Sequence, residues 1–527
     1  MPDGSLPHPK AALLSLSDKT GAAELATALI ERGIAIYATG GTRAFLRERG
    51  VEARDVEELT GFPALFGGRV KTLHPKVFGA ILYDRVDAEH AAQAQKYAIP
   101  EIVTVAVNLY PFEATVARGS ATLEEAIEQI DIGGVALLRA AAKNFEHVAV
   151  LTHPSQYAEY RAALEADDVP AILRRTLAIA AFERTAEYDV AISHYLATSG
   201  EVLPSALPGA LAVTLPLAKR LRYGTNPQAR AAFYLDRVER LPQQRHGKAL
   251  SYNNLLDLDA TLRLLSRAPL GAQFGSEHLR FVRAVVVKHA VPCGVAQRSS
   301  VGLAVREALQ ADPVSAYGGI VAADSPIDRE AATALREFFL EIVAAPSFDD
   351  EARAILETKK NLRIMEFARE LPDALARELR LRSALGGVLA EDDDPDAPAE
   401  EWRVVSRRHP EPQEWHDLAL AWDVVRHVKS NGIVIVKGGT TRGICAGQTN
   451  RVSAVEIASF RAGAGAKGAA CASDGFFPFA DGLEAAVDGG CTAIIAPGGS
   501  IRDEEVIAAA DRHAAALVFS SYRYFLH

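Results

Sequence analysis

The first 150 residues alternate short apolar runs with longer amphipathic stretches. The apolar runs are typical of buried strands: AALLSL (11–16), IAIYAT (34–39), IVTVAVN (102–108) and HVAVLT (147–152). Apolar residues recur at helical spacing between them, in GAAELATALIERG (21–33), TRAFLRERG (42–50), TLEEAIEQI (122–130) and GGVALLRAAAK (133–143). This alternation predicts a parallel sheet flanked by helices, with ligands bound at the carboxyl ends of the strands.

The pattern changes twice after residue 150. Residues 155–200 have mostly helical spacing, and TSGEVLPSALPGALAV (198–213) has the Pro, Gly and Ser content of a linker. Residues 214–527 form a second α/β region without an evident internal repeat, in which we also expect a helix over 370–388 and an acidic loop over 391–401. Its clearest strands are FVRAVVVKHA (281–290), GIVIVKG (432–438), GAACAS (468–473), CTAIIAPGG (491–499) and AALVFSS (515–521). We therefore expect domains over 1–200 and 214–527, joined by a linker over 201–213.

Composition limits the classes of function. The chain has 527 residues, about half of them apolar, and a formal net charge of −10, which argues against a general nucleic-acid surface. The start, MPDGSLPHPK, lacks a targeting pattern, and no uninterrupted apolar stretch reaches the roughly 18 residues of a membrane span. The four cysteines are scattered without a CxxC pair, as expected for free thiols in a reducing compartment. We expect a cytoplasmic protein.

One basic segment stands out in this acidic chain. GGRVKTLHPKVFG (67–79) holds Arg69, Lys71, His74 and Lys76 and no carboxylate. In an extended segment, Arg69 and Lys71 would share a face and could hold an anion or polarise a carbonyl. His74, directly before a proline, is more typical of a structural loop histidine. The cluster favours a small anionic ligand over a polyanion.

Two strand-to-helix turns have phosphate-binding chemistry. The residues that carry it are Ser15, Ser17, Lys19 and Thr20 in the first turn, and Thr39, Gly40, Gly41 and Thr42 in the second. Glycine allows close approach of the backbone, and a helix N-terminus offers free N–H groups to an anion. Ordinary helix capping by Ser and Thr is the alternative.

Two further motifs carry titratable groups. NLYPF (108–112) follows an apolar strand directly, so the phenol of Tyr110 could donate a hydrogen bond at the strand end. IDIGGVALLRAAAKN (130–144) places Asp131 before a glycine pair and Lys143 near a helix end. An N-cap is the alternative role for Asp131.

SDKTG, GGT, GRVKTLHP, NLYPF, IDIGG and AAAKN, in this order and spacing, resemble the cyclohydrolase half of the AICAR transformylase/IMP cyclohydrolase family. The resemblance covers the first 200 residues and implies a methylglyoxal-synthase-like parallel-sheet domain. It also implies that Lys71, Tyr110, Asp131 and Lys143 serve the ring closure of FAICAR to IMP. Arg69, Thr72, Asn108 and the two phosphate-type turns would bind this substrate.

Residues 214–527 resemble the transformylase half of the same family. The motifs are LRYGTNP (221–227), GKALSYNNLLD (247–257), VVVKHAVPCG (285–294), DPVSAYGG (312–319), KSNGIVIVKGG (429–439), GICAGQTNR (443–451), ASDGFFPFADG (472–482) and APGGSIRDEEV (496–506). A Lys–His pair at a strand end also suits proton transfer on chemical grounds. The resemblance implies formyl transfer from 10-formyltetrahydrofolate to AICAR, and two cytidine-deaminase-like α/β subdomains.

This resemblance assigns further residues. Lys288 and His289 match the catalytic pair, and Asn431 matches the residue that would hold the formyl oxygen. Substrate or folate contacts are implied for Arg222, Tyr223, Asn254, Glu341, Arg451, Phe476, Asp481 and Arg523. Core packing remains the alternative for FFPF (476–479). A homodimer with transformylase sites across its interface is also implied. The deaminase zinc signature is missing, so no metal is expected.

Four positions depart from the motifs of the transformylase half. Gln228 stands where a histidine is expected, and glutamine cannot titrate. Val291 replaces a polar residue, Cys445 a glycine, and Asn450 a frequent serine. Three hypotheses follow: a bifunctional enzyme, a cyclohydrolase with a degenerate second half, and a ribotide-binding regulatory protein without turnover. Retention of Lys71, Tyr110, Asp131 and Lys143 together argues against the third, because binding alone would not need all four.

Overall fold

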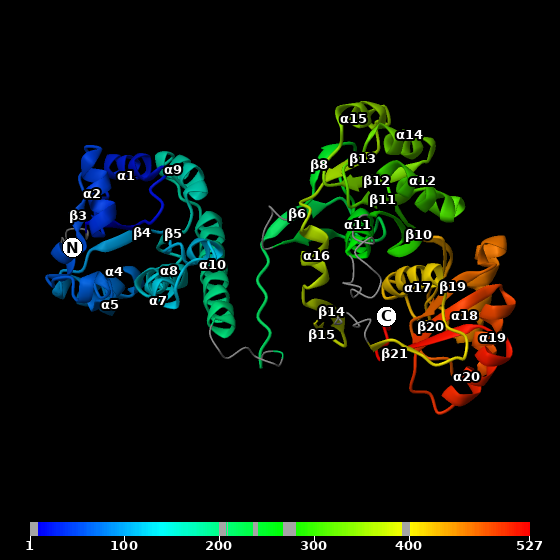
Figure 1. The fold of residues 1–527 in the computed structure, drawn as a ribbon. Coiled ribbons are helices and arrows are strands. Elements are labelled where there is room, and N and C mark those ends of the chain that lie inside the picture. The colour runs from blue at the N-terminus through cyan, green and yellow to red at the C-terminus, as the bar shows by residue number, and fades with distance from the viewer. Residues whose placement is uncertain (1–8, 200–206, 208, 236–240, 267–280, 393–400) are drawn as a thin grey trace. The chain divides into compact units, whose positions relative to one another are not determined.

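The computed structural model describes residues 9–199, 207, 209–235, 241–266, 281–392 and 401–527. The chain divides into two compact units, Met1–Thr214 (unit 1) and Leu215–His527 (unit 2), drawn in Figure 1. Most of the linker predicted over 201–213 and of the acidic loop predicted over 391–401 lies outside the described residues.

Unit 1 contains the predicted parallel sheet, with the strand order β3-β2-β1-β4-β5. The strands are β1 (Lys10–Ser15), β2 (Ala35–Ala38), β3 (Arg54–Asp55), β4 (Glu101–Val107) and β5 (Ala149–Leu151). The helices are α1 (Ala22–Glu31), α2 (Gly40–Glu48), α3 (Val56–Thr60), α4 (Pro75–Leu82), α5 (Ala88–Lys96), α6 (Phe112–Ala117), α7 (Leu123–Glu128), α8 (Gly133–Lys143), α9 (Tyr157–Glu165) and α10 (Ala171–Thr198). α9 and α10 confirm the helices expected over 155–200.

Both faces of this sheet are covered, which explains the uninterrupted apolar runs in its strands. Figure 1 shows α1 and α9 over one face, and α4 and α8 over the other. Successive residues of β1 from Ala11 to Leu14 are therefore all buried. The chain extends the sheet in one direction from β1 to β3 and in the other from β4 to β5. The strand order thus reverses between β1 and β4.

Unit 2 is a mixed α/β region built on a twelve-stranded sheet, with the order β16-β21-β20-β19-β17-β18-β10-β9-β11-β12-β13-β8. Its strands are β8 (Gln243–His246), β9 (Val282–Lys288), β10 (Val291–Arg298), β11 (Gly319–Ala323), β12 (Leu340–Ala345), β13 (Arg363–Glu366), β16 (Arg403–Val404), β17 (Ile433–Lys437), β18 (Thr440–Cys445), β19 (Ala469–Ser473), β20 (Cys491–Pro497) and β21 (Ala516–Ser520). Two separate hairpins pair β6 (Leu217–Leu221) with β7 (Ala231–Tyr234), and β14 (Arg380–Ala384) with β15 (Gly387–Glu391).

Helices cover both faces of this sheet. They are α11 (Tyr252–Leu265), α12 (Val301–Ala311), α13 (Pro313–Ala316), α14 (Arg329–Glu337), α15 (Asp350–Glu357), α16 (Leu371–Ala376), α17 (Pro412–Val425), α18 (Arg451–Ala462), α19 (Ala480–Asp488) and α20 (Asp503–Arg512). One apolar core under α11 and α17 runs across the whole sheet. The opposite face carries two cores, one with α12, α14 and α15 and one with α18, α19 and α20. Among the described residues, none of the helices combines the length and apolar character needed to cross a membrane.

The sheet of unit 2 contains a repeat that the sequence does not reveal. In each half a helix is followed by an antiparallel hairpin and then by three mutually parallel strands: α11, β9–β10 and β11–β13, then α17, β17–β18 and β19–β21. The two halves join where β10 pairs antiparallel with β18. Their likeness to cytidine deaminases stays a prediction.

The two hairpin turns of this repeat are held in the same way. His289 and Ala290 in the first turn, and Gly438 and Gly439 in the second, all have positive φ angles between 56° and 70°. Positive φ at both central residues is the geometry that two-residue hairpin turns favour. Asp257 of α11 accepts a hydrogen bond from the Ala290 amide at 2.8 Å, and Asp417 of α17 accepts from both glycine amides at 2.7–2.8 Å.

The helix predicted over 370–388 is wrong beyond its first two turns. α16 ends at Ala376, and residues 380–391 form the β14–β15 hairpin. The segment LRLRSA (379–384) alternates apolar and polar residues at the period of a strand, and Leu385 and Gly386 both have positive φ at the turn. The short period-two stretch was hidden within the longer helical pattern.

A prediction concerns the join between β10 and β18. The buried Thr441 hydroxyl accepts from the Val295 amide at 2.9 Å and donates to the Val295 carbonyl at 3.3 Å. Thr441→Val keeps the shape but leaves the amide without its acceptor. We expect unit 2 to lose about 1–3 kcal/mol of unfolding free energy, the cost of an unsatisfied buried polar group.

Tryptophan fluorescence during urea unfolding measures this loss selectively, because Trp402, Trp415 and Trp422, all three tryptophans of the chain, lie in unit 2. Thr333→Val, at an exposed hydroxyl on α14, is the matched control and should change the unfolding free energy by less than about 0.5 kcal/mol. An equal effect of both variants would show that the Thr441 contact does not stabilise the join.

Candidate functional site

The strand reversal in unit 1 places a crevice between the carboxyl ends of β1 and β4. β1 ends at Ser15, and the Ser17 hydroxyl in the next loop donates to the carbonyl of Leu109, just beyond β4, at 2.8 Å. The Asn108 side-chain amide donates to the Thr152 carbonyl at 3.1 Å and fixes the β4 side. Ligands of open parallel sheets bind at such a reversal.

The hydroxyls at this crevice face each other and do not cap a helix. Thr39 is the N-cap residue of α2, but its hydroxyl makes no cap bond and donates to the Ser15 hydroxyl at 3.2 Å. Apart from the chain neighbours and the backbone of α2 itself, no described atom lies within 4 Å of where a Cβ on Gly40 or Gly41 would stand. The first turn of α2 is therefore open to a ligand, and this arrangement suits an anion. Capping is the wrong explanation for Thr39.

Other residues of the two turns shape the loop after β1. The buried Thr42 hydroxyl accepts from the Leu16 amide at 2.9 Å. Lys19 Nζ donates to the Ser17 carbonyl at 3.4 Å, and the Thr20 amide donates to Asp18 at 2.9 Å. In this structure these side chains and amides hold the loop in place, and Ser15 and Thr39 provide the hydroxyls of the crevice.

A cavity of about 790 Å³ continues from Ser15. It is lined by six residues that the motifs singled out: Ser15, Arg69, Lys71, Thr72, Tyr110 and Asp131. They come from the end of β1, from the segment after the short 3-10 turn Phe66–Gly68, from the loop after β4 and from the loop before α8. Segments more than 100 residues apart in the sequence thus meet in one cavity.

Two carboxylates line this cavity: Glu128 pairs with Arg69, and Asp131 lies at the loop before α8. The Asp131 carboxylate accepts a hydrogen bond from the Gly134 amide at 2.6 Å, so it supports the first turn of α8 as well as lining the cavity. Burial raises the pKa of Asp131, and hydrogen bonds from the Gly134 and Tyr110 amides and the charge of Lys71 partly oppose this rise. A carboxyl group with a raised pKa can exchange a proton with a substrate more readily.

The Tyr110 phenol is a second group of this cavity whose pKa is raised. Burial raises the pKa of Tyr110, and the negative charge of Asp131 raises it further. The phenol therefore stays protonated at neutral pH and can donate a hydrogen bond into the cavity.

No motif pointed to Tyr188, which fixes the loop that carries Asp131. Its hydroxyl accepts from the Asp131 amide at 2.9 Å and donates to the Gln129 carbonyl at 2.7 Å. The side chain is fully buried, and its ring packs edge-on against Phe112 at 6.1 Å. A tyrosine in the middle of α10 has no local sequence signal for such a contact, which spans 57 residues.

The three other basic residues of unit 1 that the sequence singled out have different surroundings. Lys143 is exposed at the last turn of α8, about 15 Å along the helix from Gly133 by the usual rise per residue, and does not line the cavity. Arg69 lines it but pairs with Glu128. His74 accepts from the Lys76 amide at 3.1 Å and caps α4, the structural role expected of it.

In unit 2, strand directions bring distant motifs to one edge of the sheet, here called the reactive edge. The β9–β10 turn, the start of β17 and the carboxyl ends of β18 to β21 all fall on this edge. The predicted residues beside these strand ends are Lys288, His289, Asn431, Phe476 and Arg523. Glu341, at the start of β12, belongs to the same edge.

The Lys288–His289 pair is held by its hairpin. Lys288 Nζ donates to the Tyr317 carbonyl at 2.7 Å, and His289 is exposed at the turn. Asp257, which no motif assigned, lies beneath this turn. Burial raises the pKa of Asp257, whereas the amides of Ala290 and His289 and the charge of the imidazole oppose the rise.

Asn431 is fixed on both sides. Its side-chain amide donates to the Gln448 carbonyl at 2.9 Å, and the adjacent Ser430 hydroxyl donates to Asp474. The C-terminal segment runs alongside, with the Ser430 amide bonded to the Leu526 carbonyl at 2.9 Å and the Tyr524 amide to the Asp474 carbonyl at 3.0 Å. Arg523 is carried on this segment.

Several residues predicted to contact substrate or folate have structural partners. The buried Arg451 guanidinium donates to Asp474 and Ser473, so it supports the residues around Asn431. Glu341 pairs with Arg363 at 2.6 Å, Asn254 forms a capping box with Ser251, and Asp481 accepts from the Gly482 amide at 2.7 Å. Phe476 is 38% exposed, whereas Phe477 is buried, so FFPF serves both as core and as exposed surface.

Of the two residues near the start of unit 2 that were predicted to contact substrate, Arg222 is exposed and Tyr223 is half-buried. Arg222 and Tyr223 follow β6, and the guanidinium donates to the phenol at 3.0 Å. Gln228 lies in the same β6–β7 loop, on its exposed side. Arg523 belongs to a separate segment, where its guanidinium lies 4.8 Å from the Phe525 ring centroid.

The remaining departures from the family motifs have simple surroundings. Asn450 caps α18 by accepting from the Ser453 amide at 3.2 Å, a role that serine also fills. Val291 is half-buried at the start of β10, and Cys445 is buried at the end of β18. Of the four positions, Gln228 and Asn450 are exposed.

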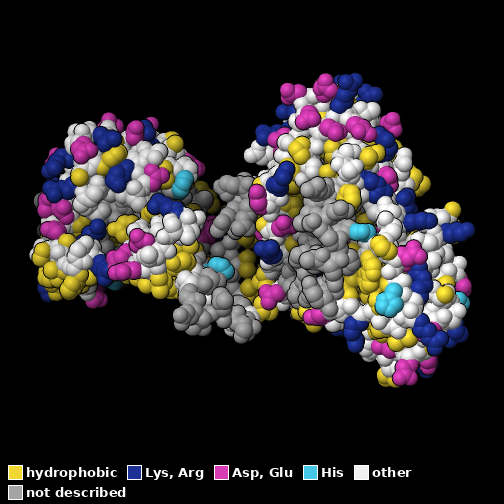
Figure 2. Space-filling model, viewed as in Figure 1, with side chains coloured by type: hydrophobic (Ala, Val, Ile, Leu, Met, Phe, Trp, Pro, Cys, Tyr) yellow, Lys and Arg dark blue, Asp and Glu magenta, His cyan; other side chains and the backbone are white. Residues whose placement is uncertain are grey.

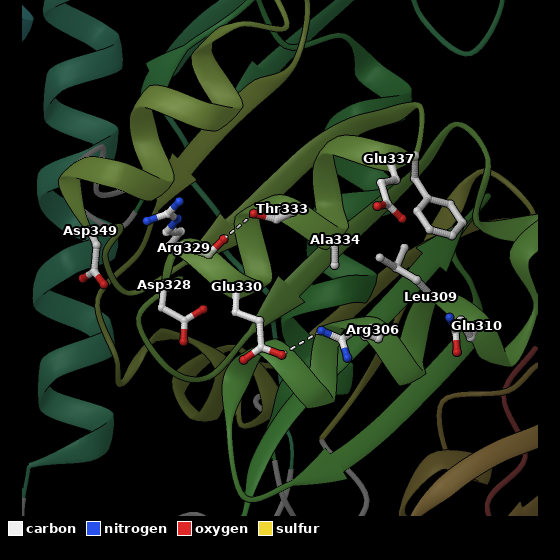
Figure 3. Close-up of a pocket in the computed structure, with 11 residues that line it drawn as sticks. Arg306, Leu309, Gln310, Asp328, Arg329, Glu330, Thr333, Ala334, Glu337 and Asp349 are labelled. Carbon is white, nitrogen blue, oxygen red and sulfur yellow. Dashed lines mark hydrogen bonds and ion pairs between the residues drawn. The ribbon is translucent and has the colours of Figure 1, made fainter.

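A cavity of about 560 Å³ on α12 and α14 has a different character (Figure 3). Arg306 pairs with Glu330 at 2.7 Å across it, and Asp328 caps α14 by accepting from the Ala331 amide at 2.8 Å. Figure 2 shows basic and acidic side chains interspersed at the end of unit 2 that carries α14 and α15. Because its charges serve an ion pair and a helix cap, we do not assign this cavity a catalytic role.

Comparison with known proteins gives a consistent result over both units. The model of the AICARFT/IMPCHase bienzyme family matches residues 141–461, and that of an MGS-like domain matches residues 21–136. Similar proteins named bifunctional purine biosynthesis protein PurH occur in Prochlorococcus marinus (47% identity) and Desulfitobacterium hafniense (46% identity), each match covering 98% of this chain and 99% of the relative. A relative of the same name in Bacillus cytotoxicus is 43% identical over 98% of this chain and its own full length.

One solved structure is also similar. It is titled crystal structure of ForH, is 36% identical and matches 36% of this chain and 98% of its own, with a TM-score of 0.31.

A second prediction tests Tyr188 as a positioning residue. Tyr188→Phe removes the hydroxyl that bonds the Asp131 amide, so the loop loosens and water reaches the carboxylate. For the reaction in this cavity, we expect kcat to fall about 2- to 12-fold, the equivalent of one hydrogen bond. The pH of half-maximal rate on the acid side should also move lower, because the pKa of a better-solvated Asp131 returns toward its ordinary value.

Tyr160→Phe is the matched control for this change. It also removes a buried hydroxyl from unit 1, bonded to Thr104 at 2.6 Å, but away from the cavity. A pH–rate profile that is identical in wild type and Tyr188→Phe would contradict the positioning role.

Proposed function

The chain belongs to the AICARFT/IMPCHase bienzyme family, and from this premise we propose how its two units divide the two reactions. It catalyses the last two steps of IMP synthesis: formyl transfer to AICAR gives FAICAR, and dehydrative ring closure of FAICAR gives IMP. The matches cover nearly the whole chain. A cyclohydrolase with a degenerate second half and a ribotide-binding protein without turnover are therefore not supported.

We assign ring closure to the 790 Å³ cavity of unit 1. The carboxamide nitrogen of FAICAR attacks the formyl carbon, a C–N bond forms, and water then leaves. Lys71 and the protonated Tyr110 would stabilise charge on the formyl oxygen, and Asp131 would take the proton from the nitrogen. The convergence of these three side chains in one cavity carries the assignment. Because the reaction is intramolecular, holding the two groups together supplies most of the rate.

The crevice beside this cavity suits the 5′-phosphate of the substrate. Ser15 and Thr39 offer hydroxyls, and the first turn of α2 offers backbone N–H groups. Lys143 was predicted to act with Asp131, but Lys143 lies in the last turn of α8, whereas Asp131 lies before its first turn. Our proposal for ring closure therefore does not use it.

We assign formyl transfer to the reactive edge of unit 2. The observation that supports this assignment is the convergence of Lys288, His289 and Asn431 on one edge through strand direction. His289 would take a proton from the attacking amine of AICAR, and the positive charge of Lys288 would favour the neutral imidazole that this step needs. Asn431 would bind the formyl oxygen. Arg222 and Arg523 would hold the AICAR phosphate as planar forks.

Formyltransferases of this family use a folate co-substrate, and we propose 10-formyltetrahydrofolate as the donor. The exposed ring of Phe476 could stack on its pterin. Within the described ranges, no group of three or more His, Cys, Asp or Glu side chains could hold a metal ion. All four cysteines are free, as expected in a reducing compartment, and we propose that the protein works in the cytoplasm.

A third prediction separates the two reactions. Lys71→Ala should lower kcat for conversion of FAICAR to IMP about 10²- to 10³-fold, through lost charge stabilisation, and leave formyl transfer to AICAR within about twofold. His289→Ala should do the reverse, lowering formyl transfer about 10²- to 10⁴-fold. Chromatography measures FAICAR and IMP when purified protein receives synthetic FAICAR or, separately, AICAR with 10-formyltetrahydrofolate.

Each variant is the control for the other. Unchanged ring closure in Lys71→Ala, or loss of both reactions in either variant while it remains folded, would refute the assignment of one reaction to each unit. Wild-type protein that makes IMP only from FAICAR would show that Gln228 and its neighbours have impaired formyl transfer.

We also propose that the chain forms a homodimer through the β14–β15 hairpin. Leu385, Val388 and Leu389 are all highly exposed on this two-stranded element. An isolated hairpin is marginally stable, and a cluster of exposed apolar side chains is typical of a protein contact. The family resemblance implies that the transformylase sites lie across the dimer interface.

A fourth prediction tests this contact. Leu385→Ser/Leu389→Ser should weaken dimerisation at least about tenfold, because two apolar side chains no longer leave water on association. Light scattering after gel filtration over a range of concentrations measures the mass, expected at twice the 56.4 kDa of one chain for wild type. Val86→Ser, at an exposed apolar residue of unit 1, should dimerise like wild type. A monomeric wild type would refute the proposal.

A further inference from the structure

The turn that carries His289 has a backbone conformation that its own residues disfavour. His289 and Ala290 are the two central residues between β9 and β10, and each has a φ angle of 56°. In this conformation a Cβ lies too close to the backbone, so positive φ is costly for both residues and free of steric cost only for glycine. Two such residues in succession persist only where the surrounding structure holds them.

Asp257 provides a contact that holds this turn from outside the hairpin. Its carboxylate accepts a hydrogen bond from the Ala290 amide at 2.8 Å. Burial raises the pKa of Asp257, and the Ala290 and His289 amides both lower it by stabilising the ionised form. The next residue of α11, Leu258, is buried in the core under the sheet. The carboxylate is therefore fixed to the sheet by a helix that is separate from the hairpin it holds.

The second hairpin of unit 2 offers an internal comparison. There Asp417 of α17 accepts from the amides of Gly438 and Gly439 at 2.7–2.8 Å. Both glycines adopt positive φ without a steric cost, so these hydrogen bonds stabilise a turn that already favours its shape. The first turn cannot use a glycine at the position of the imidazole. Its shape therefore depends more strongly on the carboxylate beneath it.

We propose that Asp257 is a positioning residue for formyl transfer, an inference that rests on the proposed role of His289. With the turn held at positive φ, the imidazole is exposed at the reactive edge, the edge at which β17 of the other half begins. Without the carboxylate, His289 and Ala290 would relax toward negative φ and carry the imidazole away from this position. Asp257 acts through the backbone of the turn and need not touch the substrate.

A carboxylate near an imidazole could instead act through its charge. The negative charge of Asp257 would stabilise the imidazolium that forms when His289 takes a proton. That role needs the carboxylate but does not depend on the steric cost of the turn. Ala290→Gly distinguishes the two roles, because it removes part of this cost and leaves the charges unaltered.

The fifth prediction concerns formyl transfer in Asp257→Ala. We expect its kcat to fall about 10- to 100-fold, as for loss of a hydrogen bond to a charged group. The KM of AICAR should stay within about threefold and ring closure from FAICAR within about twofold, since these use other residues. Adding Ala290→Gly to Asp257→Ala should raise kcat again by at least about fivefold, whereas Ala290→Gly alone should stay within about twofold of wild type.

Asp417→Ala is the matched control, because it removes the same contact from the glycine turn and should leave kcat for formyl transfer within about threefold. Urea unfolding followed by tryptophan fluorescence shows whether each variant is folded. Asp257→Asn keeps one acceptor oxygen and should have an intermediate kcat, so it tests the proposal even where Asp257→Ala does not fold.

Three results would each overturn the proposal: an unchanged kcat in folded Asp257→Ala and Asp257→Asn, an equal loss of kcat in Asp417→Ala, or a loss that Ala290→Gly does not relieve. Formyl transfer that is absent from wild type, or that survives His289→Ala, would instead refute the proposed function of this edge, and the positioning role with it.

Discussion

The antiparallel pairing of β10 with β18 is the contact on which unit 2 depends. It joins two half-sheets into one, and the Thr441 hydroxyl bonds both backbone groups of Val295 at this join. Because the two strands run in opposite directions, the first hairpin of one half lies beside the carboxyl ends of the other half. His289 and Asn431, 142 positions apart in the chain, thereby come to the same edge. A parallel join would have put them at opposite edges.

Unit 1 also brings distant residues to one edge of its sheet, but through parallel strands. All of its strands are parallel, so their carboxyl ends share one edge, and the reversal between β1 and β4 opens that edge to a ligand. Hydroxyls and backbone amides then suit the phosphate end of a ribotide, and the side chains of the longer loops suit its base. The rigid part of the site is built from strand ends and the adaptable part from loops. The 28-residue helix α10 stabilises the loop before α8 through Tyr188.

Much of this could be predicted from the sequence, and the failures have physical causes. The resemblance carried by short motifs grouped Lys71, Tyr110 and Asp131 in one site, and all three line one cavity. Lys143 was grouped with Asp131 by motif, but the rise of α8 separates them. Tyr188 and Asp257 act through contacts that span 57 and 33 residues, and such contacts leave no local pattern. The repeat in unit 2 was invisible because it depends on strand order and on a few turn and helix positions, such as Asp257 and Asp417.

The two hairpin turns of that repeat differ in the residue types that adopt the positive φ angles. The second turn uses glycines, for which positive φ carries no steric cost, whereas the first places an imidazole and a methyl group in the same conformation. On the edge of the second turn, Arg298, Glu307 and Thr440 form a closed cluster of hydrogen bonds. The two edges of the sheet thus differ: the first turn carries His289, and the second lies beside this hydrogen-bonded cluster. The repeated backbone therefore provides two equivalent turns, β9–β10 and β17–β18. Their side chains differ, and the proposed proton transfer uses the imidazole of the first turn.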